Sequence, residues 1–271
     1  MSEMDASLIP VLLVLGAVIG FLAGLLGIGG GLTLIPLLTF IFTAQHFAED
    51  HIVHIAVATA TATMMFTALS SVRAHHRQQA VLWPVVAAMA PGIVIGSLIG
   101  PQIASALPTR AFAAVFGAFV WFSATRMLIS SKPQPGRELP GKLPLFGVGT
   151  FIGAISSLLG AGGAFISVPY LARRNVRIQS AVATSAALGL PIAVAGTIGF
   201  VIAGLRQTDL PRWSAGYVYL PAMAAIVVAS ILSAPVGAHF AHRWAAAKLR
   251  RAFAVLLYSL GTYMIVKALP G

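Results

Sequence analysis

Long apolar stretches follow one another from one end of the chain to the other, and this pattern limits the folds open to it. Of the 271 residues, 58% are hydrophobic and only 8% are charged, against roughly 25% charged residues in a soluble domain. An apolar helix of about 20 residues crosses the hydrocarbon core of a bilayer, and it satisfies its own backbone hydrogen bonds there. We therefore predict an all-α integral membrane protein with ten apolar segments. The segments are 8–26, 31–43, 52–72, 81–99, 111–129, 143–159, 163–171, 178–203, 217–240 and 253–269.

Two of these segments are too short to cross a membrane as helices. Segment 31–43 has 13 residues and segment 163–171 has nine, which correspond to helices about 20 and 14 Å long. Each follows directly on a cluster of glycines, with no polar loop between. Irregular backbone at membrane depth is tolerated only against protein or water. We therefore expect two re-entrant half-helices whose broken tips stay inside the protein.

The two glycine clusters belong to a longer repeated pattern. "GLLGIGGGLTLIP" occupies positions 24–36 and "SLLGAGGAFISVP" occupies positions 157–169. Glycine makes up only 27 of the 271 residues, so glycines that match at several positions indicate an internal repeat. An offset of 133 residues aligns Gly16, Gly20, Gly27, Gly29, Gly30 and Pro36 with Gly149, Gly153, Gly160, Gly162, Gly163 and Pro169.

The matches continue beyond the glycines. "AVATA" at 56–60 pairs with "AVATS" at 181–185, and Gly96 pairs with Gly237. The repeat divides the chain into a first half, 1–135, and a second half, 136–271, with five segments in each. Because five is an odd number, the second half starts on the opposite side of the membrane, and the repeat is inverted. Short glycine-interrupted segments in such repeats are typical of secondary transporters with a binding site near the bilayer midplane.

The charged residues predict the orientation of the chain. With both termini outside, 13 of the 17 Lys and Arg residues lie on the cytoplasmic side, as the positive-inside rule requires. The four on the outer side are Arg110, Arg206, Arg212 and Lys267. The net charge of +11 therefore reflects orientation first, and we expect no nucleic-acid partner.

The glycines allow two roles. Small residues spaced by four, such as Gly16, Gly20 and Gly24, are typical of close packing between membrane helices. A half-helix that begins after a GxGG run instead offers unpaired backbone N–H groups and a partial positive charge to an anion. We predict that a second set of glycines faces an anion. This set is Gly27, Gly29, Gly30, Gly31, Gly160, Gly162 and Gly163.

Hydroxyl side chains at matched positions are further candidates. Thr59 and Thr184 occupy the same place in the two AVAT helices, and Ser185 follows the second. Thr33 and Ser167 lie within the two half-helices. These hydroxyls either donate to an oxyanion or bond the carbonyl four residues earlier in their own helix. No Asp or Glu lies inside a predicted span, which argues against a carboxylate proton relay or cation site.

The sequence gives little support for catalysis, metal binding or proton transfer by histidine. His51 and His54 flank the start of the third segment, and we expect them at the membrane interface, with proton sensing by His54 as the alternative. The chain has no cysteine, and thiolate metal sites are therefore excluded. No nucleophile, base and orienting group occur together, and no cofactor motif is present. We expect no enzymatic activity, cofactor or metal.

The two glycine runs, the AVATA and AVATS pair, and the segments "ALPTRAF" and "AKLRRAF" resemble the sulfite exporter TauE/SafE family. The resemblance spans about residues 10–268. It implies a transporter in the bacterial cytoplasmic (inner) membrane that exports sulfur-containing anions such as sulfite, thiosulfate or sulfoacetate. By motif match it adds Pro36 and Pro169 to the binding site. Ala164 stands where the first motif has Gly31, so the two half-sites need not bind equally.

Residues and resemblance together predict a secondary transporter of a small sulfur oxyanion. It would work by alternating access, with H⁺ or Na⁺ as the coupling ion. The expected partners are this anion, the coupling ion and membrane lipid. An uncoupled anion channel or uniporter is one alternative, and a membrane scaffold without transport is another.

Overall fold

The computed structural model describes residues 8–26, 31–129, 138–241 and 246–269, which are helical almost throughout. A short hairpin of two antiparallel strands, β1 (Ser214–Ala215) and β2 (Val218–Tyr219), precedes α9. The prediction of an all-α membrane protein is confirmed. The helices are α1 (Leu8–Leu26), α2 (Gly31–Ala44), α3 (Ile52–Arg77), α4 (Trp83–Ser105), α5 (Thr109–Leu128), α6 (Lys142–Leu158), α7 (Ala164–Ala172), α8 (Ile178–Gly204), α9 (Leu220–Ala241) and α10 (Ala246–Ala268).

Several helices begin or end at other residues than predicted, because apolar composition does not by itself fix where a helix begins and ends. α3 continues to Arg77, beyond the predicted end at residue 72, because a polar run extends the helix past its apolar part. The predicted segment 217–240 is wrong at its start, since Val218 and Tyr219 form a strand. Gly216 turns this hairpin with a φ of +55°, in the left-handed region that favours glycine.

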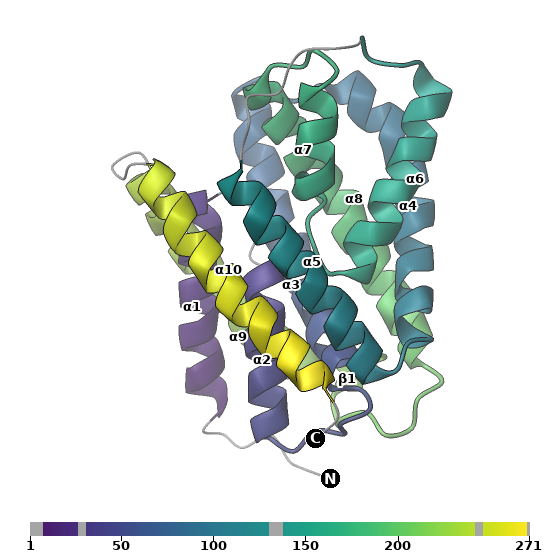
Figure 1. Cartoon of the computed structure of the whole chain (residues 1–271), viewed down its shortest axis with the longest axis vertical. Helices are drawn as coiled ribbons and strands as arrows, with labels where there is room; N and C mark the ends of the chain where they lie inside the picture. Colours follow the sequence, from purple (N-terminus) through teal and green to yellow (C-terminus); the bar gives the residue numbers. More distant parts are fainter. Residues whose placement is uncertain (1–7, 27–30, 130–137, 242–245, 270–271) are drawn as a thin grey trace.

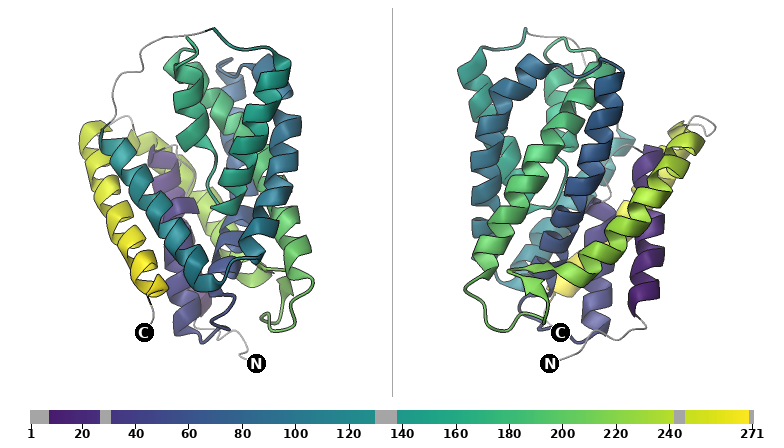
Figure 2. Two further views of the ribbon diagram at one scale, coloured as in Figure 1. Left: turned by 45° about the vertical axis from the view of Figure 1, so that its right-hand side comes forward. Right: turned by 180° about the vertical axis from the view of Figure 1, so that it is seen from behind.

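Helices from the two halves of the chain pack in exchanged pairs. α1 lies along α9 and α6 lies along α4, while α3 packs on α8 and α5 on α10. Figures 1 and 2 show α4, α6 and α8 on one side of the molecule, with α1, α9 and α10 on the other. Each pair joins one helix from residues 1–135 to one from residues 136–271, and an internal repeat predicts this arrangement.

The glycines spaced by four allow these pairs to approach closely, as predicted. A Cβ on any of the four that the structure describes in this role would overlap the backbone of the facing helix. The contacts pair Gly16 with Ile226, Gly20 with Ser230, Gly149 with Met89 and Gly153 with Ile93. Gly149 and Gly153 come 133 residues after Gly16 and Gly20 in the sequence. The facing residues, Ile226 and Ser230, come 137 residues after Met89 and Ile93. The two helix pairs thus meet at equivalent positions.

Both short helices predicted after the glycine runs are present. α2 has 14 residues and α7 has nine. α1 and α2 occupy the end of the molecule where both termini lie, whereas α6 and α7 start from and return to the opposite end (Figures 1 and 2). The break between α6 and α7 lies deep within the molecule (Figure 1).

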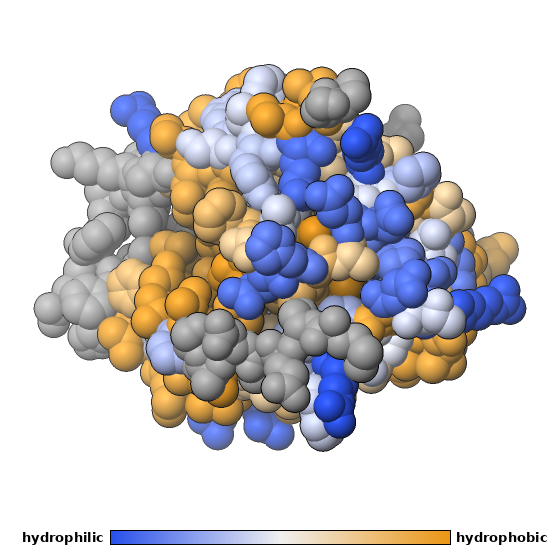
Figure 3. Space-filling view, turned by 90° about the horizontal axis from the view of Figure 1, so that it is seen from below, coloured by the Kyte–Doolittle hydropathy of each residue, from blue (hydrophilic) through white to orange (hydrophobic). Residues whose placement is uncertain are grey.

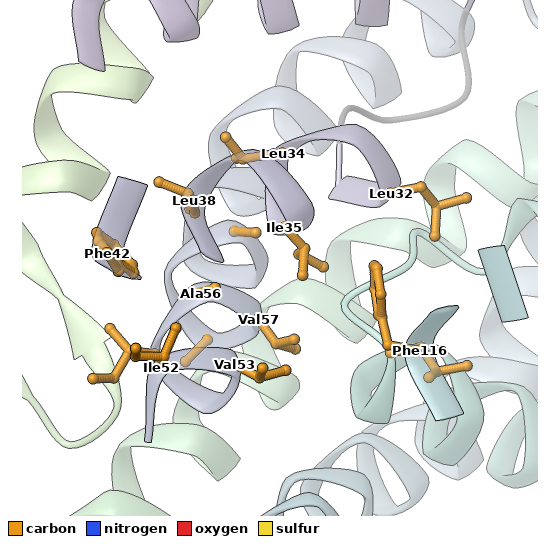
Figure 4. Close-up of a cluster of buried hydrophobic side chains, with 14 of the residues drawn as sticks. Leu32, Leu34, Ile35, Leu38, Phe42, Ile52, Val53, Ala56, Val57 and Phe116 are labelled. Atoms are coloured by element: carbon orange, nitrogen blue, oxygen red, sulfur yellow. The ribbon is translucent and has the colours of Figure 1, made fainter. Parts of the chain in front are cut away.

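Apolar side chains fill the interior and also cover much of the outside. Ile35 and Leu38 of α2 pack beside Val57 of α3 in the core (Figure 4). Leu143 is 81% exposed and Leu232 is 73% exposed, as expected for side chains that face lipid. By length and composition, α3, α4, α5 and α8 are long and apolar enough to cross a membrane. Hydrophilic side chains gather instead at the end of the molecule seen in Figure 3.

Candidate functional site

The break between α6 and α7 depends on two glycines. α6 ends where the N–H of Ala161 donates to the carbonyl of Ser156 and the N–H of Gly160 to that of Ser157, at 2.8 and 3.2 Å. Gly160 and Gly163 have φ angles of +55° and +73°. A residue with a Cβ enters this region at a cost of about 1–2 kcal/mol. The glycines therefore turn the chain, and Gly163 becomes the N-cap of α7.

This break touches the first half of the chain in the interior of the molecule. A Cβ on Gly31, the first residue of α2, would overlap the carbonyl oxygen of Gly160. A Cβ on Gly160 would stand 2.6 Å from Ile35 of α2 and 3.2 Å from Val57 of α3, two side chains labelled in Figure 4. The contact between the break and the start of α2 therefore requires glycine on both sides.

The N-terminus of α7 lacks a capping side chain among the described residues. The N–H groups of Ile166 and Ser167 both donate to the carbonyl of Gly163, at 3.1 and 2.9 Å. The N–H groups of Ala164 and Phe165 precede these bonds and have no intrahelical acceptor. Their partial positive charge, together with the helix dipole, favours an anion at this position.

A buried hydroxyl lies beside this N-terminus. Ser156 is 1% exposed, and its Oγ has no hydrogen-bond partner in the part of the chain that the structure describes. This Oγ lies 3.4 Å from the position that a Cβ on Gly163 would take, and Ile192 and Ile152 are the other neighbours of that position. Ser156 was not among the predicted site residues, although it replaces Ala23 of the first half at the offset of 133.

Two predicted serines hold α7 against α8. Ser167 Oγ donates to the carbonyl of Gly163 at 2.8 Å and lies 2.6 Å from Ser185 Oγ. A serine hydroxyl has one proton, so Ser185 is the donor in the second bond. Both protons are therefore used within the protein, and in this structure the two serines position the start of α7.

Thr59 and Thr184 make equivalent contacts to the opposite half of the chain. Thr59 Oγ1 accepts from the backbone N–H of Tyr219, and Thr184 Oγ1 accepts from that of Leu82, both at 3.0 Å. Leu82 is the N-cap of α4, and Tyr219 directly precedes α9. Thr61, in contrast, donates to the carbonyl four residues earlier in its own helix. The matched threonines thus join the halves at the starts of two helices.

The other predicted site residues fall into two groups. Three of them, Gly27, Gly29 and Gly30, lie outside the described residues. Thr33 is buried in α2, while Pro36 and Pro169 each occupy the sixth position of their half-helix. A Cβ on Gly162 would stand 3.2 Å from the terminal methyl of Met64, which places this glycine beside α3.

His54 is the third residue of α3, near the start of the third segment as predicted, and its side chain is buried within the protein. The side chain is 2% exposed, and its Nε2 lies 2.9 Å from the carbonyl oxygen of Ala104. Its ring also stacks on that of Tyr217, with 5.2 Å between the centroids. His54 therefore ties α3 to the end of α4. Within the described ranges, no three His, Asp or Glu side chains lie close enough together to hold a metal.

Comparison with known proteins finds one matching family and several relatives. The family model described as sulfite exporter TauE/SafE matches residues 12–264. A probable membrane transporter protein of Haemophilus influenzae is 32% identical over 257 residues, which cover 94% of this chain and 97% of the relative. A probable membrane transporter protein of Methanocaldococcus jannaschii is 27% identical over 263 residues, 96% of each chain. No solved structure matches the chain significantly. The chain is thus a multi-pass membrane protein that belongs to the sulfite exporter TauE/SafE family.

Proposed function

We propose that this protein is a secondary transporter that exports a small sulfur-containing oxyanion from the bacterial cytoplasm. The proposed substrates are sulfite, thiosulfate and organosulfonates such as sulfoacetate. The family name supports the class of anion. The single observation that carries the proposal is the close contact of Gly31 with the carbonyl of Gly160, because it brings the break of one half against the half-helix of the other.

The anion is held by backbone dipoles and hydroxyls. The free N–H groups at the start of α7 are one set of donors, and Gly27, Gly29 and Gly30 are proposed to supply an equivalent set before α2. Glycine at these positions lets an anion approach the backbone closely. Thr33, Thr59 and Thr184 are the proposed hydroxyl contributors.

The apolar surroundings strengthen such a site. Ile192 and Met64 stand beside the glycine break. In surroundings of low dielectric constant, a hydrogen bond to a charged oxygen is stronger than the same bond in water. A neutral site of this kind binds an anion without a lysine or arginine and releases it when water enters.

Transport is by alternating access between two groups of helices, each of which combines both halves of the chain. Gly163 and Ser156 are buried, so an anion reaches them only after helices move apart. Each half contains a helical hairpin, α1–α2 in the first and α6–α7 in the second. The contacts of α1 with α9 and of α6 with α4 connect each of these hairpins to a helix of the other half. A rocking motion of one such unit against the other would open the site to one side of the membrane at a time.

A flux assay in proteoliposomes tests this proposal. The purified protein is reconstituted, and sulfite efflux is measured with and without an imposed proton or sodium gradient. A coupled transporter responds to one of these gradients beyond its effect on membrane voltage. Flux that ignores both gradients would support an uncoupled anion channel instead, and absence of flux with sulfite, thiosulfate and sulfoacetate would support a scaffold.

A further inference from the structure

Ser156 is unusual among the hydroxyl residues of α6. Thr150 donates to the carbonyl of Phe146 four residues earlier, and Ser157 donates to the carbonyl of Ala154. A serine within a membrane helix normally satisfies its hydroxyl in this way. Ser156 Oγ is buried and makes no such bond among the described residues. An unpaired buried hydroxyl destabilises the folded state, and a ligand or an ordered water that binds beside it would supply the missing partner.

The position of Ser156 indicates where this partner binds. Its Oγ lies 3.4 Å from the place of the Cβ that the N-cap of α7 lacks. A capping side chain attached there would present an oxygen to the N–H groups of the first turn of the helix. A ligand oxygen beside this first turn would take the role of the capping oxygen and accept from Ala164 or Phe165 and from Ser156, once the end of the Ile192 side chain, 2.7 Å from the Cβ place, moves aside. The helix terminus and the unpaired hydroxyl are two independent indications of one ligand.

The donors select the chemical class of this ligand. The N–H groups only donate, and the Gly163 carbonyl already accepts from Ile166, Ser167 and the Ser167 hydroxyl. Ile152 and Ile192 are the apolar neighbours of the N-cap position. A group that only accepts hydrogen bonds and carries negative charge fits such surroundings, and a small oxyanion has both properties.

The two half-sites differ in this respect. At the offset of 133, Ser156 corresponds to Ala23, and alanine has no hydroxyl to donate. We infer that Ser156 donates a hydrogen bond to the transported oxyanion at the N-terminus of α7, which makes the second half of the chain the stronger anion-binding half. This inference rests on the proposed function, which it deepens by assigning a binding residue and an unequal pair of half-sites.

Binding of sulfite, thiosulfate and methanesulfonate to the full-length protein in detergent tests the assignment, with chloride as the ionic-strength control. Titration calorimetry gives the Kd, and thermal unfolding gives the stabilisation by each anion. Ser156→Ala is expected to raise the Kd about tenfold to a hundredfold while leaving the anion-free Tm unchanged or higher. Ser157→Ala, which removes a paired hydroxyl on the neighbouring residue, is expected to leave the Kd unchanged. Ser156→Cys keeps the size of the side chain with a weaker donor and is expected to reproduce the loss.

The outcomes separate this inference from the proposed function. Equal Kd values for Ser156→Ala and the wild type would overturn the role of Ser156, and transport by the wild type would leave the proposed function standing. A wild type that none of the three anions stabilises would also overturn it, and the proposed function would then be judged by flux alone. Loss of binding in Ser157→Ala to the same extent would indicate a general effect of the helix and would contradict the assignment.

Discussion

Thr59 Oγ1 lies 3.0 Å from the backbone nitrogen of Tyr219, and this hydrogen bond joins the two halves of the chain. The bond between Thr184 and Leu82 is its counterpart, with the same distance and the halves exchanged. Thr59 and Thr184 are matched positions of the predicted repeat. Leu82 and Tyr219 directly precede α4 and α9, the fourth helix of each half. The hydrogen bonds thus support the repeat independently of the glycine pattern.

Thr59→Val and Thr184→Val are expected to destabilise the protein to a similar extent. Valine has nearly the same shape, but it leaves the buried N–H of Tyr219 or the part-buried N–H of Leu82 without its acceptor, at a cost of about 1–3 kcal/mol. Thr61→Val is the matched control, because among the described residues Thr61 bonds within its own helix, and we expect a cost of about 0.5 kcal/mol. Unfolding in detergent measures all three, and equal costs for Thr59→Val and Thr61→Val would argue against the cross-half bond.

Gly31→Ala is expected to disturb the contact between the start of α2 and the break between α6 and α7. The added methyl group would overlap the backbone carbonyl of Gly160, and such overpacking costs about 1–3 kcal/mol. Gly147→Ala is the control, since a Cβ there meets nothing within 4 Å and should stabilise α6 by about 0.5–1 kcal/mol. Thermal unfolding distinguishes the two variants, and a Gly31→Ala protein as stable as Gly147→Ala would be inconsistent with the contact.

Gly163→Ala is expected to abolish anion binding in addition to reducing stability. The φ of +73° disfavours any Cβ, and the new methyl group would stand 2.7 Å from Ile192 Cδ1 at the start of α7. Gly216→Ala introduces a Cβ at a similar φ of +55° in the β-hairpin and serves as the control. Both variants should unfold at lower temperature, but only Gly163→Ala should lose the stabilisation by sulfite. Retained stabilisation in Gly163→Ala would contradict the proposed position of the anion.

Alkaline pH is expected to destabilise the protein through two buried tyrosines. Burial raises the pKa of Tyr217 and of Tyr219 above the ordinary value of 10.0, and a hydrogen bond with Gln207 opposes the shift for Tyr217. The unfolded state releases these phenol protons first, so their contribution is complete below about pH 10 and is lost above it. Thermal unfolding between about pH 8 and 11 should show this fall, with a shallower slope in Tyr217→Phe. An unchanged slope in that variant would show that Tyr217 is not responsible.

Much of the fold could be predicted, because a helix that crosses a membrane needs a run of about 20 apolar residues, and such runs are visible in the sequence. α1 begins and ends at the predicted residues, and the two half-helices follow the two glycine runs. The β-hairpin could not be predicted, since strands of two residues have no periodicity to detect. The pairing of Gly96 with Gly237 implies an offset of 141, whereas the contacts of α4 and α9 favour 137. This difference is about one helical turn, and small apolar residues on such helices do not distinguish one turn from the next.

The site was only partly predictable for a different reason. Gly160 and Gly163 could be selected because a helix break in the left-handed region requires glycine. The partners of Thr59 and Thr184 lie 160 and 102 residues away in sequence, so the role of each threonine depends on packing that no local pattern encodes. Ser156, the residue proposed above to bind the anion, was not predicted, because a repeat points to matched positions and Ser156 corresponds to Ala23 at the offset of 133.

Counterflow of sulfite in proteoliposomes tests the central claim most directly. Vesicles preloaded with unlabelled sulfite and diluted into a trace of labelled sulfite report whether one binding site is exposed alternately to the two sides of the membrane. Alternating access predicts that the preloaded anion accelerates uptake of the label and produces a transient accumulation, which Gly163→Ala abolishes and Gly147→Ala retains. Uptake of label that is unaffected by preloading would contradict alternating access, and absence of uptake would contradict sulfite transport altogether.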